Sequence, residues 1–103
     1  MSKEESLFNE IGNSISDAVK GQLFGKPCYK IGKKAFSCFF LECMVFKLNE
    51  PYHTMAMKLE GAKLFDPSAK NRPMKEWVQL PYTHHSEWHK FAEHAKNYIQ
   101  ESQ

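Results

Sequence analysis

Apolar residues near the N-terminus recur three and four positions apart, which is the spacing of one helix face. They are Leu7, Ile11, Ile15, Ala18 and Val19. Ser2 and Glu5 have the spacing of a capping box at the start of a helix. Gly21 follows the last apolar position and is a typical helix end. The pattern predicts an amphipathic helix over about residues 3–20.

The next segment changes to short runs of aromatic and other strand-favouring residues. The runs are Cys28–Ile31, Ala35–Leu41 and Met44–Leu48, with Gly32-Lys33 as a tight turn between the first two. In the third run, Met44, Phe46 and Leu48 fall on one face, and Val45 and Lys47 fall on the other. This alternation predicts a sheet with one covered side.

The middle run is apolar on both faces. Phe36, Cys38 and Phe40 alternate there with Ala35, Ser37 and Phe39. We therefore expect a central strand, whose second face is covered by a helix or by a second subunit.

Two further strands and a short helix follow in the second half. Tyr52–Leu59 suits a helix that closes near Gly61, and Leu64-Phe65 is a brief strand. Met74–Leu80 resumes strand alternation, but it puts Glu76 on an otherwise apolar side. Either that face is partly exposed or a bulge shifts the register, and the sequence leaves both alternatives open.

A last helix is predicted after Pro81, with Ser86 as its cap. Its apolar residues have helical spacing: Trp88, Phe91, Ala92, Ala95, Tyr98 and Ile99. The order of elements predicts one α+β domain over residues 1–103.

The charge of the chain is nearly balanced, with 14 basic and 12 acidic side chains and a net charge of +2. Nucleic-acid binders concentrate positive charge, and they favour arginine, of which Arg72 is the one copy. The densest basic run consists of Lys26, Lys30, Lys33 and Lys34, and it suits a solvated hairpin or a weak anion- or nucleic-acid-binding patch. We expect no specific nucleic-acid binding. No apolar run reaches the length of about 18 residues that a spanning helix needs, so we expect no membrane association.

The cysteines are odd in number and include no C-x-x-C pair. We expect Cys28 and Cys38 to be buried in strands and Cys43 to lie near a turn. Met1–Glu5 is not followed by the apolar core of a secretion signal. Both features favour reduced thiols and a cytoplasmic location.

Motifs for catalysis, metals and cofactors are missing from the sequence. The chain contains no glycine-rich phosphate loop, no G-x-S-x-G and no H-E-x-x-H. His84, His85 and His89 are close in sequence, but a helix capped by Ser86 would separate His85 from His89. Cys43 has no designated base beside it. We expect a protein that is not an enzyme, with no catalytic residues, no metal and no cofactor.

Three segments together resemble the TfoX N-terminal domain family, over about residues 20–100. They are Leu23-Phe24-Gly25-Lys26-Pro27, Leu59-x-Gly61-Ala62-x-x-Phe65-Asp66-Pro67 and Arg72-Pro73-Met74-Lys75-Glu76-Trp77-Val78. The resemblance implies a two-layer α+β fold similar to secretion chaperones, with an antiparallel sheet of about five strands flanked by N- and C-terminal helices. It supplies no catalytic motif.

The resemblance indicates a small cytoplasmic binding or interaction domain, a monomer or a homodimer, whose protein partner is unknown. The alternative is a small-ligand-binding or weakly catalytic domain that uses the groove beside the helix at residues 52–63. The candidate residues for a partner or a loop clamp are Arg72, Asp66, Lys75 and Trp77. In one interpretation, Arg72 grips a carboxylate or phosphate of a partner. In the other, it pairs with Asp66 and holds the Asp66–Pro73 connection closed.

Overall fold

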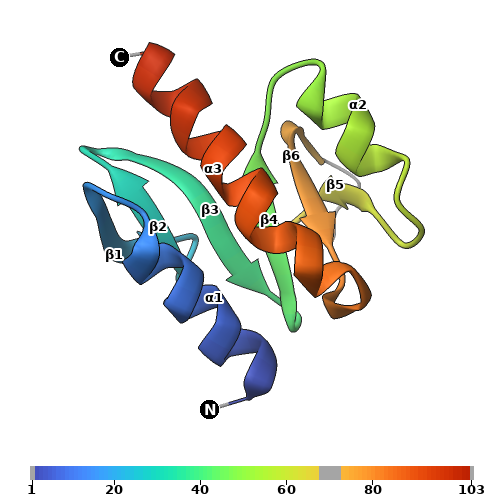
Figure 1. The fold of residues 1–103 in the computed structure, drawn as a ribbon, viewed down its shortest axis with the longest axis horizontal. Coiled ribbons are helices and arrows are strands. Elements are labelled where there is room, and N and C mark those ends of the chain that lie inside the picture. The colour runs from blue at the N-terminus through green and yellow to red at the C-terminus, as the bar shows by residue number, and fades with distance from the viewer. Residues whose placement is uncertain (1, 68–72, 103) are drawn as a thin grey trace.

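The computed structural model describes residues 2–67 and 73–102. Its helices are α1 (Lys3–Ser14), α2 (Tyr52–Met57) and α3 (His85–Ser102), with a 3-10 turn, η1 (Tyr82–His84), before α3. Its strands are β1 (Ala18–Leu23), β2 (Lys26–Ile31), β3 (Lys34–Phe40), β4 (Cys43–Lys47), β5 (Lys63–Phe65) and β6 (Met74–Leu80). All neighbouring strands are antiparallel, in the order β1-β2-β3-β4-β6-β5. Helices α1 and α3 cross one face of this sheet, and α2 lies at the side of β6 and β5 (Figure 1).

The α+β class with an antiparallel sheet between two terminal helices is confirmed, with six strands where about five were predicted. Within the described residues, no helix combines the length and the apolar character needed to cross a membrane.

The additional strand comes from a wrong prediction at the N-terminus. Ser2 caps the helix as predicted, because its hydroxyl oxygen accepts a hydrogen bond from the Glu5 amide at 3.1 Å. The helix, however, ends at Ser14 rather than near residue 20, and the chain turns at Asp17 with φ of 69°.

The segment Ala18–Leu23 forms β1 because β2 offers it a full antiparallel ladder. Val19 has the spacing of the apolar helix face, but it lies in the strand, where its side chain is 63% exposed. Gly21 lies in the middle of β1 and is not a helix cap. Pairing with a neighbouring strand overrides local periodicity here, and that pairing is invisible in a helical pattern.

A bulge in β3 corrects the predicted alternation of the central strand. Tyr29 of β2 pairs with Ser37 and the next residue of β2 pairs with Ala35, so Phe36 is the extra residue. A bulge of this kind keeps two successive residues on one face. Phe36 therefore packs under the helices, while Cys38 packs on the opposite face.

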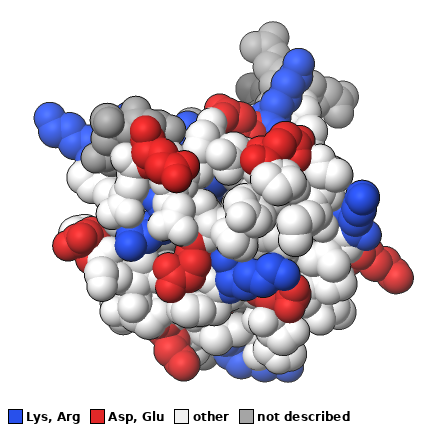
Figure 2. Space-filling view, turned by 45° about the horizontal axis from the view of Figure 1, so that its top comes forward, with Lys and Arg blue, Asp and Glu red and all other residues white. Residues whose placement is uncertain are grey.

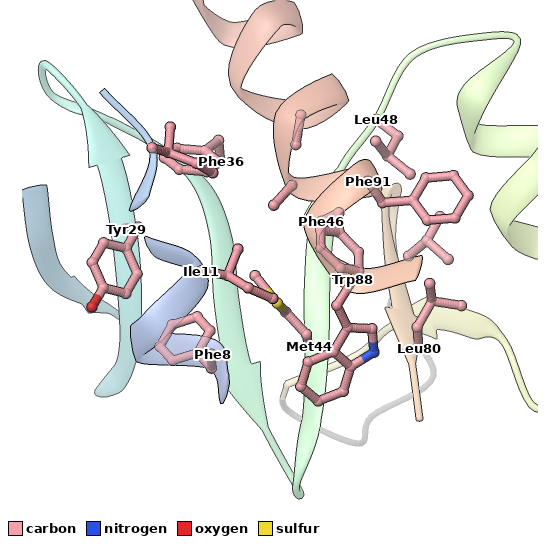
Figure 3. Packing of buried hydrophobic residues seen from close by; sticks show 14 of the residues in the cluster. Phe8, Ile11, Tyr29, Phe36, Met44, Phe46, Leu48, Leu80, Trp88 and Phe91 are labelled. Atoms are coloured by element: carbon pink, nitrogen blue, oxygen red, sulfur yellow. The ribbon is translucent and has the colours of Figure 1, made fainter. Parts of the chain in front are cut away.

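Two apolar clusters cover the two faces of the sheet. The larger one fills the space between the sheet and helices α1 and α3 (Figure 3). Met44, Phe46 and Leu48 belong to it as predicted. The prediction of one covered side is wrong at this strand, because Val45 is fully buried in the smaller cluster on the other face. The smaller cluster consists of Cys28, Cys38, Val45, Phe65 and Trp77. The apolar strand β3 is thus covered on both faces within one chain.

Both alternatives left open for β6 hold in part. Leu64 pairs with Val78 but Phe65 pairs with Met74, so one step in β5 spans four residues of β6. Met74 therefore packs with the smaller cluster and Val78 with the larger one. Glu76 is exposed at the end of the helix-covered side, where Tyr98 of α3 donates a hydrogen bond to it.

Candidate functional site

Two hairpin turns present large apolar side chains to solvent. Phe24 lies in the β1–β2 turn and is 58% exposed, and Leu41 lies in the β3–β4 turn and is 69% exposed. Alternate turns of an antiparallel meander lie at the same end of the sheet, so the two side chains share one end. Leu23 and Phe40, both half-buried, precede them in the strands. We call these four residues the hairpin-tip surface.

The backbone at both turns is in the left-handed region. Phe24 has φ of 53° and Leu41 has φ of 52°, and neither is glycine or asparagine. This conformation costs a side chain with a Cβ about 1–2 kcal/mol, and two-residue turns ordinarily place asparagine, aspartate or glycine there. Phe24 and Leu41 are both more than half exposed, so burial recovers only part of that cost. The two residues are therefore poor choices for folding alone.

A cation and a ring flank this surface. The Nζ atom of Lys26 lies 5.4 Å from the centroid of the Phe40 ring, within the range of a cation–π contact. The same ring packs edge-on against Phe65, with centroids 5.3 Å apart. The surface thus has a fixed apolar base with a positive charge beside it.

The hairpin-tip surface was not singled out from the sequence. In the sequence, Phe24 belongs to a family motif and Leu41 belongs to a predicted strand. The available signal is a bulky residue in a two-residue link between strands, where turn chemistry calls for asparagine or glycine.

A pocket of about 270 Å³ lies where α2, β6 and α3 meet, beside the predicted groove. We call it the α2 pocket. It is lined by Leu48, Asn49, Glu50, His53, Lys75, Glu76 and Tyr98.

The Glu50 carboxylate has a fixed orientation in this pocket. Its Oε1 atom accepts hydrogen bonds from the Thr54 hydroxyl at 2.6 Å and from the Thr54 amide at 3.0 Å. These bonds lower the pKa of Glu50, the hydroxyl bond contributing most. The other oxygen, Oε2, lies 4.0 Å from Nδ1 of His53.

The imidazole of His53 is also oriented. Its Nε2 lies 2.7 Å from the carbonyl oxygen of Lys75. Because a carbonyl only accepts, Nε2 carries a hydrogen and donates it. In the neutral ring, Nδ1 then keeps its lone pair and faces Glu50. On the α3 side, the Tyr98 hydroxyl donates to the Glu76 carboxylate, and this bond raises the pKa of Tyr98.

The structure separates the residues that the sequence singled out as candidates. Lys75 is exposed and lines the α2 pocket. Trp77 is buried in the smaller cluster on the other face and is not part of a surface. Asp66 is half-buried just after β5. Arg72 lies outside the described residues, so its pairing with Asp66 stays a prediction.

The histidines near the start of α3 are arranged differently from the prediction. The helix begins at His85, so Ser86 is not its cap, and His85 and His89 lie on the same helix. The His85 ring donates from Nδ1 to the Tyr82 carbonyl at 3.0 Å, and Nε2 of His89 lies 3.3 Å from the Ser14 hydroxyl. In residues 2–67 and 73–102, no three His, Cys, Asp or Glu side chains are grouped to hold a metal ion.

Two buried cysteines face each other across β2 and β3. Cys28 and Cys38 are directly opposite in the register, and both are fully buried. Burial, with a smaller contribution from Cys28, raises the pKa of Cys38 to about 12. Burial also raises the pKa of Cys28. Cys43 is half-buried beside the β3–β4 turn. The predicted burial of the first two cysteines is confirmed.

We expect the three thiols to differ sharply in reactivity. N-ethylmaleimide added to the folded protein should modify Cys43 first, because thiolate character and access control the rate. Cys28 and Cys38 should react only after unfolding in denaturant. Peptide mass spectrometry over a time course measures this order. Equal rates at all three sites in the folded protein would contradict the burial of the pair.

Charged side chains of both signs are interspersed on the face shown in Figure 2, without a continuous area of either sign. Comparison with family models, with curated proteins and with solved structures finds no match to this chain. The resemblance to the TfoX N-terminal domain family accordingly stays a hypothesis that rests on the quoted motifs.

Proposed function

We propose that this chain is a small, non-catalytic interaction domain of the TfoX N-terminal type, which binds a protein partner in the cytoplasm. The observation that carries the proposal is the pair of exposed apolar residues, Phe24 and Leu41, held on left-handed backbone at neighbouring hairpin tips. Conformations that cost folding energy cluster at sites that the function requires.

The chemistry of this surface suits a protein partner with an apolar cleft. Aromatic and aliphatic anchors that enter a pocket supply most of the energy of small interfaces. The Lys26 ammonium beside Phe40 suits an acidic residue at the rim of that cleft. Nucleic acid is a poorer candidate, because the net charge is only +2.

The test replaces both tip residues with asparagine, which adopts left-handed backbone readily. We expect Phe24→Asn/Leu41→Asn to leave the free energy of unfolding unchanged or to raise it by about 1 kcal/mol. Binding to the partner should weaken at least about 100-fold, because two apolar anchors are lost. The partner is found by affinity capture from the native host, and its affinity for each variant is then measured by calorimetry.

Met55→Gln is the matched control, since Met55 is an exposed apolar residue on ordinary helical backbone away from the tips. The control should retain the partner. Light scattering decides whether the partner is a second copy, in which case the wild-type chain is a dimer and the double variant a monomer. Partner binding that survives in the double variant would refute the proposal.

A further inference from the structure

Several hydrogen-bond acceptors lie in the wall of the α2 pocket, although most of its accessible lining is apolar. The Lys75 carbonyl and Oε1 of Glu50 already have donors from within the chain. Oε2 of Glu50 and Nδ1 of His53 face each other at 4.0 Å, which is too long for a hydrogen bond. When the His53 imidazole is neutral, its Nδ1 is a hydrogen-bond acceptor, as Oε2 of Glu50 is. A donor from outside the chain is therefore the natural complement to this pair.

The spacing of these two atoms fits one nitrogen that carries several hydrogens. A nitrogen placed about 2.9 Å from each of them would have ordinary hydrogen-bond lengths to both. The two bonds then make an angle of about 87° at the nitrogen, so two hydrogens of a tetrahedral centre can each point to within about 11° of an acceptor. An ammonium group has this geometry and three donors.

The charges lining the pocket favour a cation. Glu50 and Glu76 are acidic and Lys75 is the one Lys or Arg in the lining, so these three side chains carry a net negative charge. Leu48 adds an apolar part to the lining, against which a short alkyl chain can lie.

We propose that the α2 pocket binds a primary alkylammonium group, which hydrogen-bonds to Oε2 of Glu50 and Nδ1 of His53 and is further attracted by Glu76. A free amine and a lysine side chain of a protein both present this group. The site lies apart from the hairpin-tip surface, and it does not depend on the function proposed above.

Titration with n-butylamine hydrochloride tests the proposal by amide-resolved NMR on the full chain. We expect saturable shifts centred on Glu50, His53 and Glu76, with a millimolar dissociation constant because the ligand is small. Potassium chloride at equal concentration and n-butanol should give no saturable shifts there. Nα-acetyllysine methylamide, run in parallel, tells a lysine side chain from a free amine by which of the two binds more tightly.

Variants of the lining residues test whether the pocket recognises the positive charge of the ligand. Glu50→Gln and Glu76→Gln should each weaken butylamine binding, the first about tenfold or more, since a hydrogen bond to a charged group is lost. Lys75→Gln should strengthen binding about twofold to fivefold, because it removes a like charge. Glu60→Gln, which makes the same charge change outside the pocket, should have no effect.

Glutamine keeps the acceptor oxygen that Thr54 and Tyr98 use, so the variants should fold. Unshifted amide signals outside the pocket verify this. Absence of saturable shifts, equal affinity in Glu50→Gln and the wild type, or weaker binding in Lys75→Gln would each overturn the proposal. Butylamine binding that persists in Phe24→Asn/Leu41→Asn separates this site from the tip surface.

Discussion

Replacing Gly12 with alanine is expected to destabilise the fold by about 2–3 kcal/mol, the cost of forcing an extra group into a packed core. Helix propensity alone predicts the opposite, since alanine stabilises a helix interior by about 1 kcal/mol relative to glycine. The packing of α1 against β2 decides between the two effects.

A Cβ atom at Gly12 would lie 2.3 Å from a ring carbon of Tyr29. That ring is fully buried and cannot swing away freely. Phe8 packs edge-on against the Tyr29 ring, with ring centroids 5.1 Å apart. The Tyr29 hydroxyl donates a hydrogen bond to the side-chain oxygen of Asn9 at 3.0 Å. The close approach of helix and strand therefore requires glycine.

Gly21→Ala is the matched control. Its Cβ would meet the flexible end of the Lys30 side chain, at 3.0 Å from Cε, and that chain can move. Urea denaturation followed by circular dichroism should show a large loss of stability for Gly12→Ala and a change within about 0.5 kcal/mol for Gly21→Ala. The double variant Gly12→Ala/Tyr29→Ala should cost less than the sum of its parts, because the clash is removed. Additive effects would contradict the proposed clash.

Local sequence patterns correctly predict the elements whose structure depends on side chains near one another in the chain. The Ser2 cap, the shared face of Met44, Phe46 and Leu48, and the apolar face of α3 with the exception of Tyr98 appear as predicted. Each depends on side chains a few positions apart, which the sequence displays directly. The sequence also indicates the exposure of Glu76, because a glutamate interrupts an otherwise apolar side of that strand.

Features that depend on pairing between distant segments were missed. β1 exists because β2 pairs with it, and the bulge at Phe36 exists because β2 and β3 differ by one residue in register. No spacing in either segment reports the partner's register.

The candidate sites were harder still to predict, because they join residues from separate elements. Glu50 and His53 precede or begin α2, Lys75 lies in β6 and Tyr98 lies in α3. The sequence suggests a groove beside α2, but the placement of acceptors in the pocket there depends on side-chain orientation that only the tertiary structure provides. The hairpin tips required knowledge of the turn conformation.

The largest single-residue effect is expected at Trp88. Its side chain is fully buried in the larger core with Met44 and Leu80 (Figure 3), and its Nε1–H donates to the Pro81 carbonyl at 3.3 Å. Trp88→Ala should cost about 3–5 kcal/mol, since it leaves a cavity that the surrounding sheet and helix cannot fill. Trp88→Phe should cost about 1–2 kcal/mol, because most of the volume remains and the hydrogen bond is lost.

Trp77→Ala provides the comparison on the other face of the sheet. Among residues 2–67 and 73–102, the cluster of Trp77 holds four other fully buried residues, and the apolar side chains packed against it are half-buried. The neighbours of Trp77 can therefore relax into the space more completely. We therefore expect Trp77→Ala to cost at least about 1 kcal/mol less than Trp88→Ala. The chain has two tryptophans, so Trp77 remains as a fluorescent probe in the Trp88 variants, and its transition should coincide with the one seen by circular dichroism. Equal costs at the two positions would show that the smaller cluster is packed as rigidly as the larger one, because the cost of a cavity rises as its surroundings relax less.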